Sequence, residues 1–196
     1  MKNLLMFLVF VSLLGACTGE DQRQPQTLAP VKTDLELLLE QTAQNPKDAD
    51  AWYHLADLYD RVELYEQEID ALKKVVALQP KRGYAYLRMG NACNRLGKYP
   101  EAVQAFEQAK PYQAKNPVLY NNLAFAYGKL GRTKDEIAAL RKAIALRPRY
   151  ATARFNLAVA SLRNGDRGEA LTQYKALNNI DGTLAAQLKK EIEHTR

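Results

Sequence analysis

Apolar residues recur along most of this 196-residue chain with the spacing of amphipathic helices. When the sequence is aligned on itself at a shift of 34 residues, four units follow one another without a gap or insertion, starting at Ala49, Gly83, Pro117 and Ala151. In the first half of each unit, apolar or small residues fall mainly at positions 4, 7, 8 and 11, which places them on one face of a helix. The pattern predicts four consecutive helical hairpins.

Each unit repeats the kinds of residue that two packed helices need. A small residue at position 8 lets the first helix approach the second, larger apolar residues fill the space between them, and proline at position 32 ends the second helix. The first helices carry Trp52, Leu55, Ala56, Tyr59, Tyr86, Met89, Gly90, Cys93, Tyr120, Leu123, Ala124, Tyr127, Leu157 and Ala158. The second helices carry Leu72, Pro80, Ala102, Phe106, Ala109, Leu140, Ala143, Pro148, Ala170 and Tyr174.

These recurring residues make positions 49 to about 182 resemble tetratricopeptide repeats. The resemblance implies an all-α fold, a right-handed α-solenoid of helix-turn-helix repeats with flanking helices. The expected parts are a half-repeat helix at 34–48, repeats at 49–82, 83–116, 117–150 and 151–182, and a capping helix at 183–196. Leu184, Leu188 and Ile192 form the apolar face of this cap, which an open solenoid end needs for solubility.

Four residues depart from the family pattern. Glu68 and Glu136 occupy position 20, where a small packed residue is usual, and Ser161 replaces an aromatic residue at position 11 of the fourth unit. A buried carboxylate is costly unless it is paired, so we expect both glutamates to lean toward solvent or to find a basic partner. Pro111 should cut the second helix of the second unit short.

The first residues have the features of a secretion signal. Lys2 precedes an apolar run of eleven residues, which is shorter than the roughly 18 residues of a membrane-spanning helix. The LGAC sequence that follows, ending at Cys17, resembles a bacterial lipobox. The resemblance implies that residues 1–16 are a lipoprotein signal peptide, that Cys17 is acylated after its removal, and that the acyl chains hold the protein at a membrane.

Residues 17–33 contain two prolines and no periodic apolar residues, so we expect a flexible tether. Thr18, rather than aspartate, follows Cys17, which by resemblance to Gram-negative lipoproteins favours the outer membrane, with the folded part facing the periplasm. Two alternatives stay open. The apolar run could remain as a transmembrane anchor, or Cys17 could be an ordinary thiol behind a standard secretory signal.

Composition and the candidate chemical motifs restrict the classes of function that the sequence allows. The 47% apolar content excludes a wholly disordered chain, and the net charge of +6 comes from scattered Lys and Arg residues, so nucleic acid is not an expected partner. His54 and His194 lie too far apart in the repeats to share a zinc ion, and no nucleotide-binding or Ser-His-acid motif is present. We therefore predict no enzyme activity, cofactor or small-molecule substrate. Cys93 is interpreted as a core residue, with a disulfide to another chain as the alternative.

The family resemblance also indicates where a partner binds. In tetratricopeptide solenoids the first helices line a concave groove, into which positions 2, 5, 6, 9, 12 and 13 point. The candidate partner-binding residues are Tyr53, His54, Asp57, Tyr84, Arg88, Asn91, Arg95, Asn121, Asn122, Phe125, Lys129, Phe155 and Asn156. Position 13 is basic in all four units, which suits either an acidic peptide or simply the negative end of each helix dipole. The asparagines resemble the ladder of some peptide-binding relatives.

Two kinds of function agree with these features. The favoured hypothesis is a lipid-anchored adaptor or scaffold that binds a protein or peptide in the groove. The alternative is an assembly factor, similar to lipoproteins that pilot pilus, secretion or outer-membrane subunits, or an accessory subunit of a cell-wall enzyme.

Overall fold

The computed structural model describes residues 33–195, which form ten α-helices and no strand. The helices are α1 (Asp34–Gln44), α2 (Ala49–Arg61), α3 (Tyr65–Leu78), α4 (Gly83–Arg95), α5 (Tyr99–Gln113), α6 (Pro117–Lys129), α7 (Thr133–Leu146), α8 (Ala151–Arg163), α9 (Arg167–Asn178) and α10 (Gly182–His194). The proposed signal peptide, Cys17 and most of the proposed tether lie outside the described residues, so these remain predictions.

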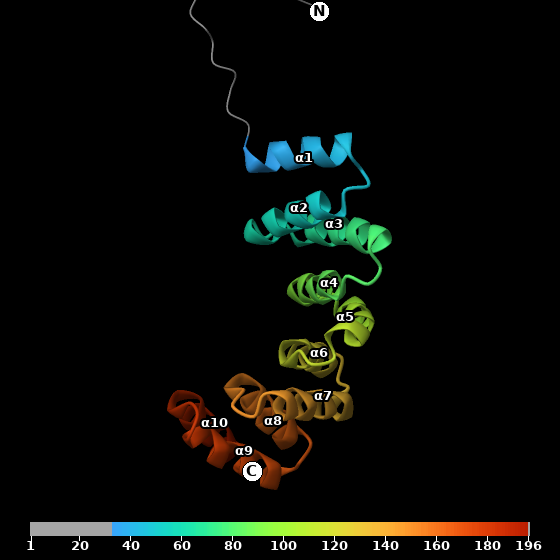
Figure 1. The fold of residues 1–196 in the computed structure, drawn as a ribbon. Helices are drawn as coiled ribbons and strands as arrows, with labels where there is room; N and C mark the ends of the chain where they lie inside the picture. The colour runs from blue at the N-terminus through green and yellow to red at the C-terminus, as the bar shows by residue number, and fades with distance from the viewer. Residues whose placement is uncertain (1–32, 196) are drawn as a thin grey trace, which may run out of the picture. The chain divides into compact units, whose positions relative to one another are not determined.

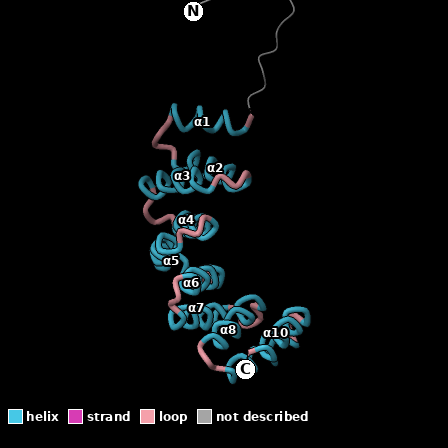
Figure 2. The backbone as a smooth tube through the Cα atoms, turned by 180° about the vertical axis from the view of Figure 1, so that it is seen from behind, coloured by secondary structure: helices cyan, strands magenta, loops and turns pink. Residues whose placement is uncertain are grey.

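The helices pack in chain order (Figures 1 and 2). Four hairpins, α2/α3, α4/α5, α6/α7 and α8/α9, are formed by one unit each, and the second helix of each hairpin contacts the first helix of the next. At the ends, α1 packs on α2, and α10 packs on α8 and α9. The first helices also approach one another, as the contact between α4 and α6 shows. The expected all-α architecture is confirmed.

Local sequence explains where the hairpins turn. Gly97, Gly131 and Gly165 occupy position 15 of three units and have φ angles of 73°, 71° and 80° between the two helices of their hairpins. Glycine adopts this left-handed conformation without a steric penalty. The first unit has Glu63 at the same position with φ 61°, so the turn geometry is kept even without glycine. The cap residue Asp48 accepts hydrogen bonds from the backbone N–H groups of Asp50 and Ala51 at the start of α2.

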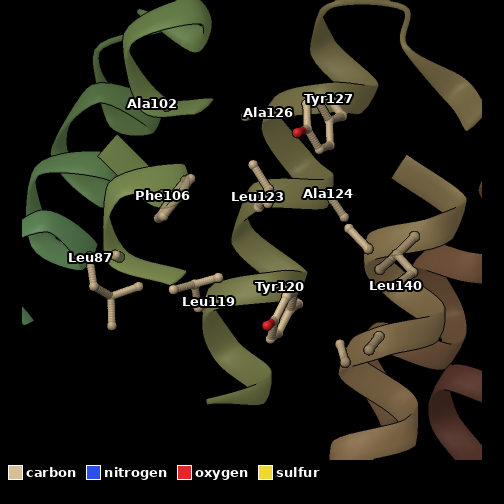
Figure 3. Packing of buried hydrophobic residues seen from close by; sticks show 14 of the residues in the cluster. Leu87, Ala102, Phe106, Leu119, Tyr120, Leu123, Ala124, Ala126, Tyr127 and Leu140 are labelled. Atoms are coloured by element: carbon tan, nitrogen blue, oxygen red, sulfur yellow. The ribbon is translucent and has the colours of Figure 1, made fainter. Parts of the chain in front are cut away.

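Among residues 33–195 the core divides into three clusters of small and large residues, and the largest runs from α3 to α8 and so crosses from one hairpin to the next. Figure 3 shows Leu119 and Leu123 of α6 facing Phe106 on one side, while Ala124 and Leu140 lie on the other side. Phe106 is fully buried, and a Cβ atom on Gly90 would lie only 2.5 Å from its ring. Because Gly90, at position 8 of its repeat, has no side chain, the Phe106 ring can occupy that space.

The expectation for Pro111 is wrong. Helix α5 continues through this proline to Gln113 and is the longest helix among the described residues. Pro111 cannot donate a hydrogen bond to the Glu107 carbonyl and its ring crowds that carbonyl, but its fixed φ angle suits a helix. Because α5 ends two residues later, the loss is confined to its last turn.

Both unusual glutamates pair with an arginine, which is one of the two outcomes expected from the sequence. Glu68 is buried, and its Oε1 accepts hydrogen bonds from Nε and Nη2 of Arg88 at 3.1 and 3.0 Å. Glu136 is also buried, and both its oxygens lie 2.6 Å from Nη2 of Arg163. Each arginine belongs to the first helix of the next hairpin, so each pair links two repeats.

Burial dominates the electrostatics of these pairs. Desolvation raises the pKa of the Glu68 carboxyl to about 7, although the Arg88 guanidinium opposes the shift. Desolvation likewise raises the pKa of Glu136, again opposed by its arginine. Removing one partner of such a pair would leave the other charge buried and uncompensated.

We predict that Gly90→Ala destabilises the fold by about 1–2 kcal/mol, because overpacking against Phe106 outweighs the better helix propensity of alanine. Gly168→Ala is the control, since the nearest atom to its added Cβ is Asp166 Oδ1 at 3.5 Å, and it should be neutral or slightly stabilising. Chemical denaturation of both variants tests this. A Gly90→Ala protein as stable as the parent would contradict the packing argument.

A second prediction concerns pH. Because the pKa of Glu68 is higher in the folded state than its ordinary value near 4.5, its favourable contribution is complete below about pH 4.5 and is lost as pH rises through 7. Between pH 5 and 8 the unfolding free energy of the parent should fall by up to about 3 kcal/mol relative to Glu68→Gln. Denaturation curves across this range measure the difference. The exposed neighbour Glu66→Gln is the control, and a parent-to-Glu68→Gln difference that does not change with pH would refute the prediction.

Candidate protein-binding groove

One face of the first helices is not used for packing within the hairpins. Position 8 of α2, α4, α6 and α8 is buried in every repeat, whereas positions 6, 9 and 13 are half-buried or exposed in every repeat. Side chains at these positions connect successive first helices, as Asn122 and Asn91 do at 2.8 Å. We call this surface the groove face.

At the amino-terminal end of the groove face, Arg88 holds several candidate residues together. Besides binding Glu68, its guanidinium donates to the Ala56 carbonyl at 3.1 Å and to Asp57 at 3.4 Å. It also lies 5.2 Å from the centre of the Tyr53 ring, which Arg82 approaches to 4.2 Å. The Arg88 side chain is only 16% exposed. These contacts occupy most of its N–H donors, so Arg88 stabilises the first two repeats and offers little to a partner.

The asparagines form a chain of hydrogen bonds across three repeats. Asn156 donates to Asn121, Asn121 donates to Asn122, and Asn122 donates to Asn91, at 3.1, 3.2 and 2.8 Å. Asn94, which the sequence analysis missed, donates to the backbone carbonyl of Asn122 at 3.1 Å. Much of the hydrogen-bonding capacity of this ladder is thus already used within the protein.

Between α6, α7 and α8 the groove face is hollowed into a cavity of about 230 Å³. Its lining residues are Ala124, Phe125, Gly128, Lys129, Glu136, Leu140, Phe155, Asn156, Val159 and Arg163. Phe125 is 46% exposed, and the Lys129 ammonium lies 5.4 Å from the centre of its ring. Four predicted site residues, Phe125, Lys129, Phe155 and Asn156, therefore lie together here.

Six of the ten lining residues were not among the candidates, and three of these bear on the groove face or on its charge. Val159 and Arg163 occupy groove positions 9 and 13, and Glu136 departs from the family pattern at position 20. Gly128 is the residue of the sequence that could have pointed to Glu136 as a cavity residue, because a Cβ on this glycine would lie 2.8 Å from the Glu136 carboxylate. A glycine at position 12 thus makes room for a glutamate that arrives from the second helix.

The remaining candidates are spread along the groove face. His54 is exposed on α2, and Arg95 donates to the Tyr65 hydroxyl at 2.7 Å and stacks over its ring. Tyr84 is 58% exposed and lies beside Tyr112 at the connection between α5 and α6, apart from the cavity.

No three His, Cys, Asp or Glu side chains within residues 33–195 gather closely enough to hold a metal ion. No helix in this part of the chain combines the length and apolar character needed to cross a membrane. Cys93 is buried, and desolvation raises the pKa of its thiol, which makes it less reactive.

Family models match three stretches of the chain. Residues 49–82 and 122–179 match models described as tetratricopeptide repeat, and residues 90–131 match a model described as TPR repeat. None of the curated proteins compared with the chain matches it significantly.

Solved structures share the fold. A crystal structure of MamA has a TM-score of 0.71 and 22% sequence identity, and the match covers 80% of this chain and 87% of that one. YrrB, a TPR protein with an unusual peptide-binding site, has a TM-score of 0.67 and 25% identity, with 82% and 87% covered. A thermophilic TPR protein of Thermus thermophilus has a TM-score of 0.59 and 26% identity, with 80% and 87% covered. The folded part of this chain is therefore a right-handed α-solenoid built of tetratricopeptide repeats.

Proposed function

We propose that this protein is an adaptor or scaffold that binds a segment of another polypeptide along the groove face. The observation that carries the proposal is the cavity between α6, α7 and α8, which lies on the groove face and exposes Phe125. Exposed aromatic side chains in a concave site are typical anchors for a partner. The similarity to YrrB, which is described as having an unusual peptide-binding site, supports the same kind of ligand. No catalytic step belongs to the proposal.

We further propose that acylated Cys17 holds the protein at the bacterial outer membrane, with the solenoid in the periplasm. The support is the sequence alone, namely the short apolar run followed by a lipobox-like LGAC sequence. Residues 17–33 then act as a tether that lets the groove reach a partner away from the lipid surface. An assembly factor for envelope machinery would use the same anchor and groove.

Cross-linking tests the groove. A photo-reactive amino acid in place of Phe125 should cross-link the full-length, membrane-bound protein to a partner polypeptide. The same amino acid in place of Ala145, an exposed residue of the second helix α7, is the control and should give little cross-linked product. Mass spectrometry of the adducts identifies the partner. Cross-links from position 145 but not from position 125 would contradict binding at the groove face.

Labelling tests the anchor. Cells grown with radioactive palmitate should label the parent and the Cys93→Ala variant but not Cys17→Ala, because Cys17 alone is expected to carry acyl chains. Gel electrophoresis of the purified proteins gives the readout. Label that persists in Cys17→Ala, or an unlabelled parent, would show that the anchor is assigned wrongly.

A further inference from the structure

The cavity on the groove face contains an arginine that already holds an internal carboxylate. Arg163 reaches both Glu136 oxygens through one nitrogen, Nη2, and its side chain is 50% exposed while that of Glu136 is 9% exposed. A guanidinium has five N–H donors in a planar fork. Among residues 33–195 the Arg163 guanidinium makes no other hydrogen bond, and half of its side chain is exposed, so its remaining donors are available to a ligand.

A second cation stands at the same opening. Lys129 is exposed, and among residues 33–195 no carboxylate lies within ion-pair distance of its ammonium. Its contact is with the Phe125 ring. With two cations and one internal carboxylate, the cavity carries an excess positive charge that favours an anionic group.

The inner wall is apolar and small. Phe125, Phe155, Val159 and Leu140 line it, and the volume of about 230 Å³ is below the range of about 300–1,000 Å³ that is typical of small-molecule sites. A space of this size suits one bulky side chain of a longer ligand. The ligand that fits both features therefore carries an apolar side chain close to a carboxylate.

The other arginine–glutamate pair cannot serve in the same way. Arg88 is enclosed by Glu68, Asp57 and Tyr53, and its side chain is 16% exposed. Asp57 also holds Arg61 at 2.7 Å. An anionic ligand thus finds accessible cations at α6 and α8, and carboxylates at α2.

We propose that the cavity between α6, α7 and α8 binds an acidic polypeptide segment, in which one bulky apolar side chain enters the cavity and a neighbouring carboxylate pairs with Lys129 and Arg163. Glu136 is a positioning residue, because it orients Arg163 without touching the partner. The inference rests on the proposed groove function and adds the chemical class of the partner.

Selection from a library of random dodecapeptides displayed on phage tests the class directly. The full-length protein in detergent is the bait, and enriched peptides should share an aromatic or branched apolar residue within two positions of Asp or Glu. A synthetic peptide with the most enriched sequence then serves as the probe in fluorescence anisotropy. Replacing its acidic residues by Asn and Gln should weaken binding about tenfold, as should replacing its apolar residue by alanine.

Variants of the protein locate the site. Lys129→Gln should weaken binding of the probe peptide about fivefold to tenfold, and added salt should weaken binding to the parent more than to this variant. Phe155→Ala should also weaken it, and circular dichroism checks that this half-buried position still permits folding. Arg61→Gln is the matched control, because Arg61 occupies the same repeat position in α2 and is paired with Asp57, and it should leave affinity unchanged.

Three results would overturn this inference. The first is a library that yields no enriched peptide or peptides without acidic residues, and the second is a probe peptide that Lys129→Gln binds as tightly as the parent. Binding of sodium laurate in place of any peptide would also overturn it, because a fatty acid carries an apolar chain and a carboxylate too. If cross-links from position 125 persist in any of these cases, the groove function survives and only the ligand class is wrong.

Discussion

The structure depends on the close approach of the two helices within each hairpin. At position 8 the chain has Ala56, Gly90, Ala124 and Ala158, and all four are buried. Such small residues let a large neighbour, of which Phe106 is the clearest example, fill the space between helices and continue the core into the next hairpin. Because one side of each first helix is committed to this contact, the opposite side remains open, and the groove face is a consequence of the packing.

Two buried carboxylates modify this common plan in different ways. Glu68 and Glu136 occupy the same repeat position, yet Glu68 is bound by an arginine at position 6 and Glu136 by an arginine at position 13 of the next repeat. The first pair leaves little of the Arg88 guanidinium accessible to a partner, because Arg88 is surrounded by groove residues. The second leaves Arg163 half exposed beside a cavity. The repeat position of the arginine that pairs with the glutamate at position 20 therefore distinguishes the two ends of the groove face. An arginine at position 6 gives a structural end, and an arginine at position 13 gives an end suited to binding.

The repeat pattern was sufficient to predict the helices but not the pairing of groove side chains. The period appears in the sequence because each hairpin needs the same small and large residues, and position 15 repeats because the turn needs a left-handed residue. The prediction that Pro111 shortens its helix was wrong, since a proline near a helix end disturbs only the last turn. The bonds from Asn122 to Asn91 and from Arg163 to Glu136 join residues 31 and 27 positions apart, and such offsets depend on how neighbouring hairpins are rotated. Candidate groove residues could be listed from sequence, whereas which of them remain free to bind could not.

Side-chain footprinting of the protein with its cross-linked or co-purified partner bound would show whether the groove face is the binding surface. Hydroxyl radicals oxidise exposed aromatic and aliphatic side chains, and mass spectrometry reports the extent at each residue. If the partner binds in the cavity, Phe125 and Phe155 are oxidised in the free protein and protected in the complex, while Tyr112 and Leu171, which are exposed away from the cavity, react equally in both. Protection of Tyr112 or Leu171, with Phe125 and Phe155 unchanged, would contradict it.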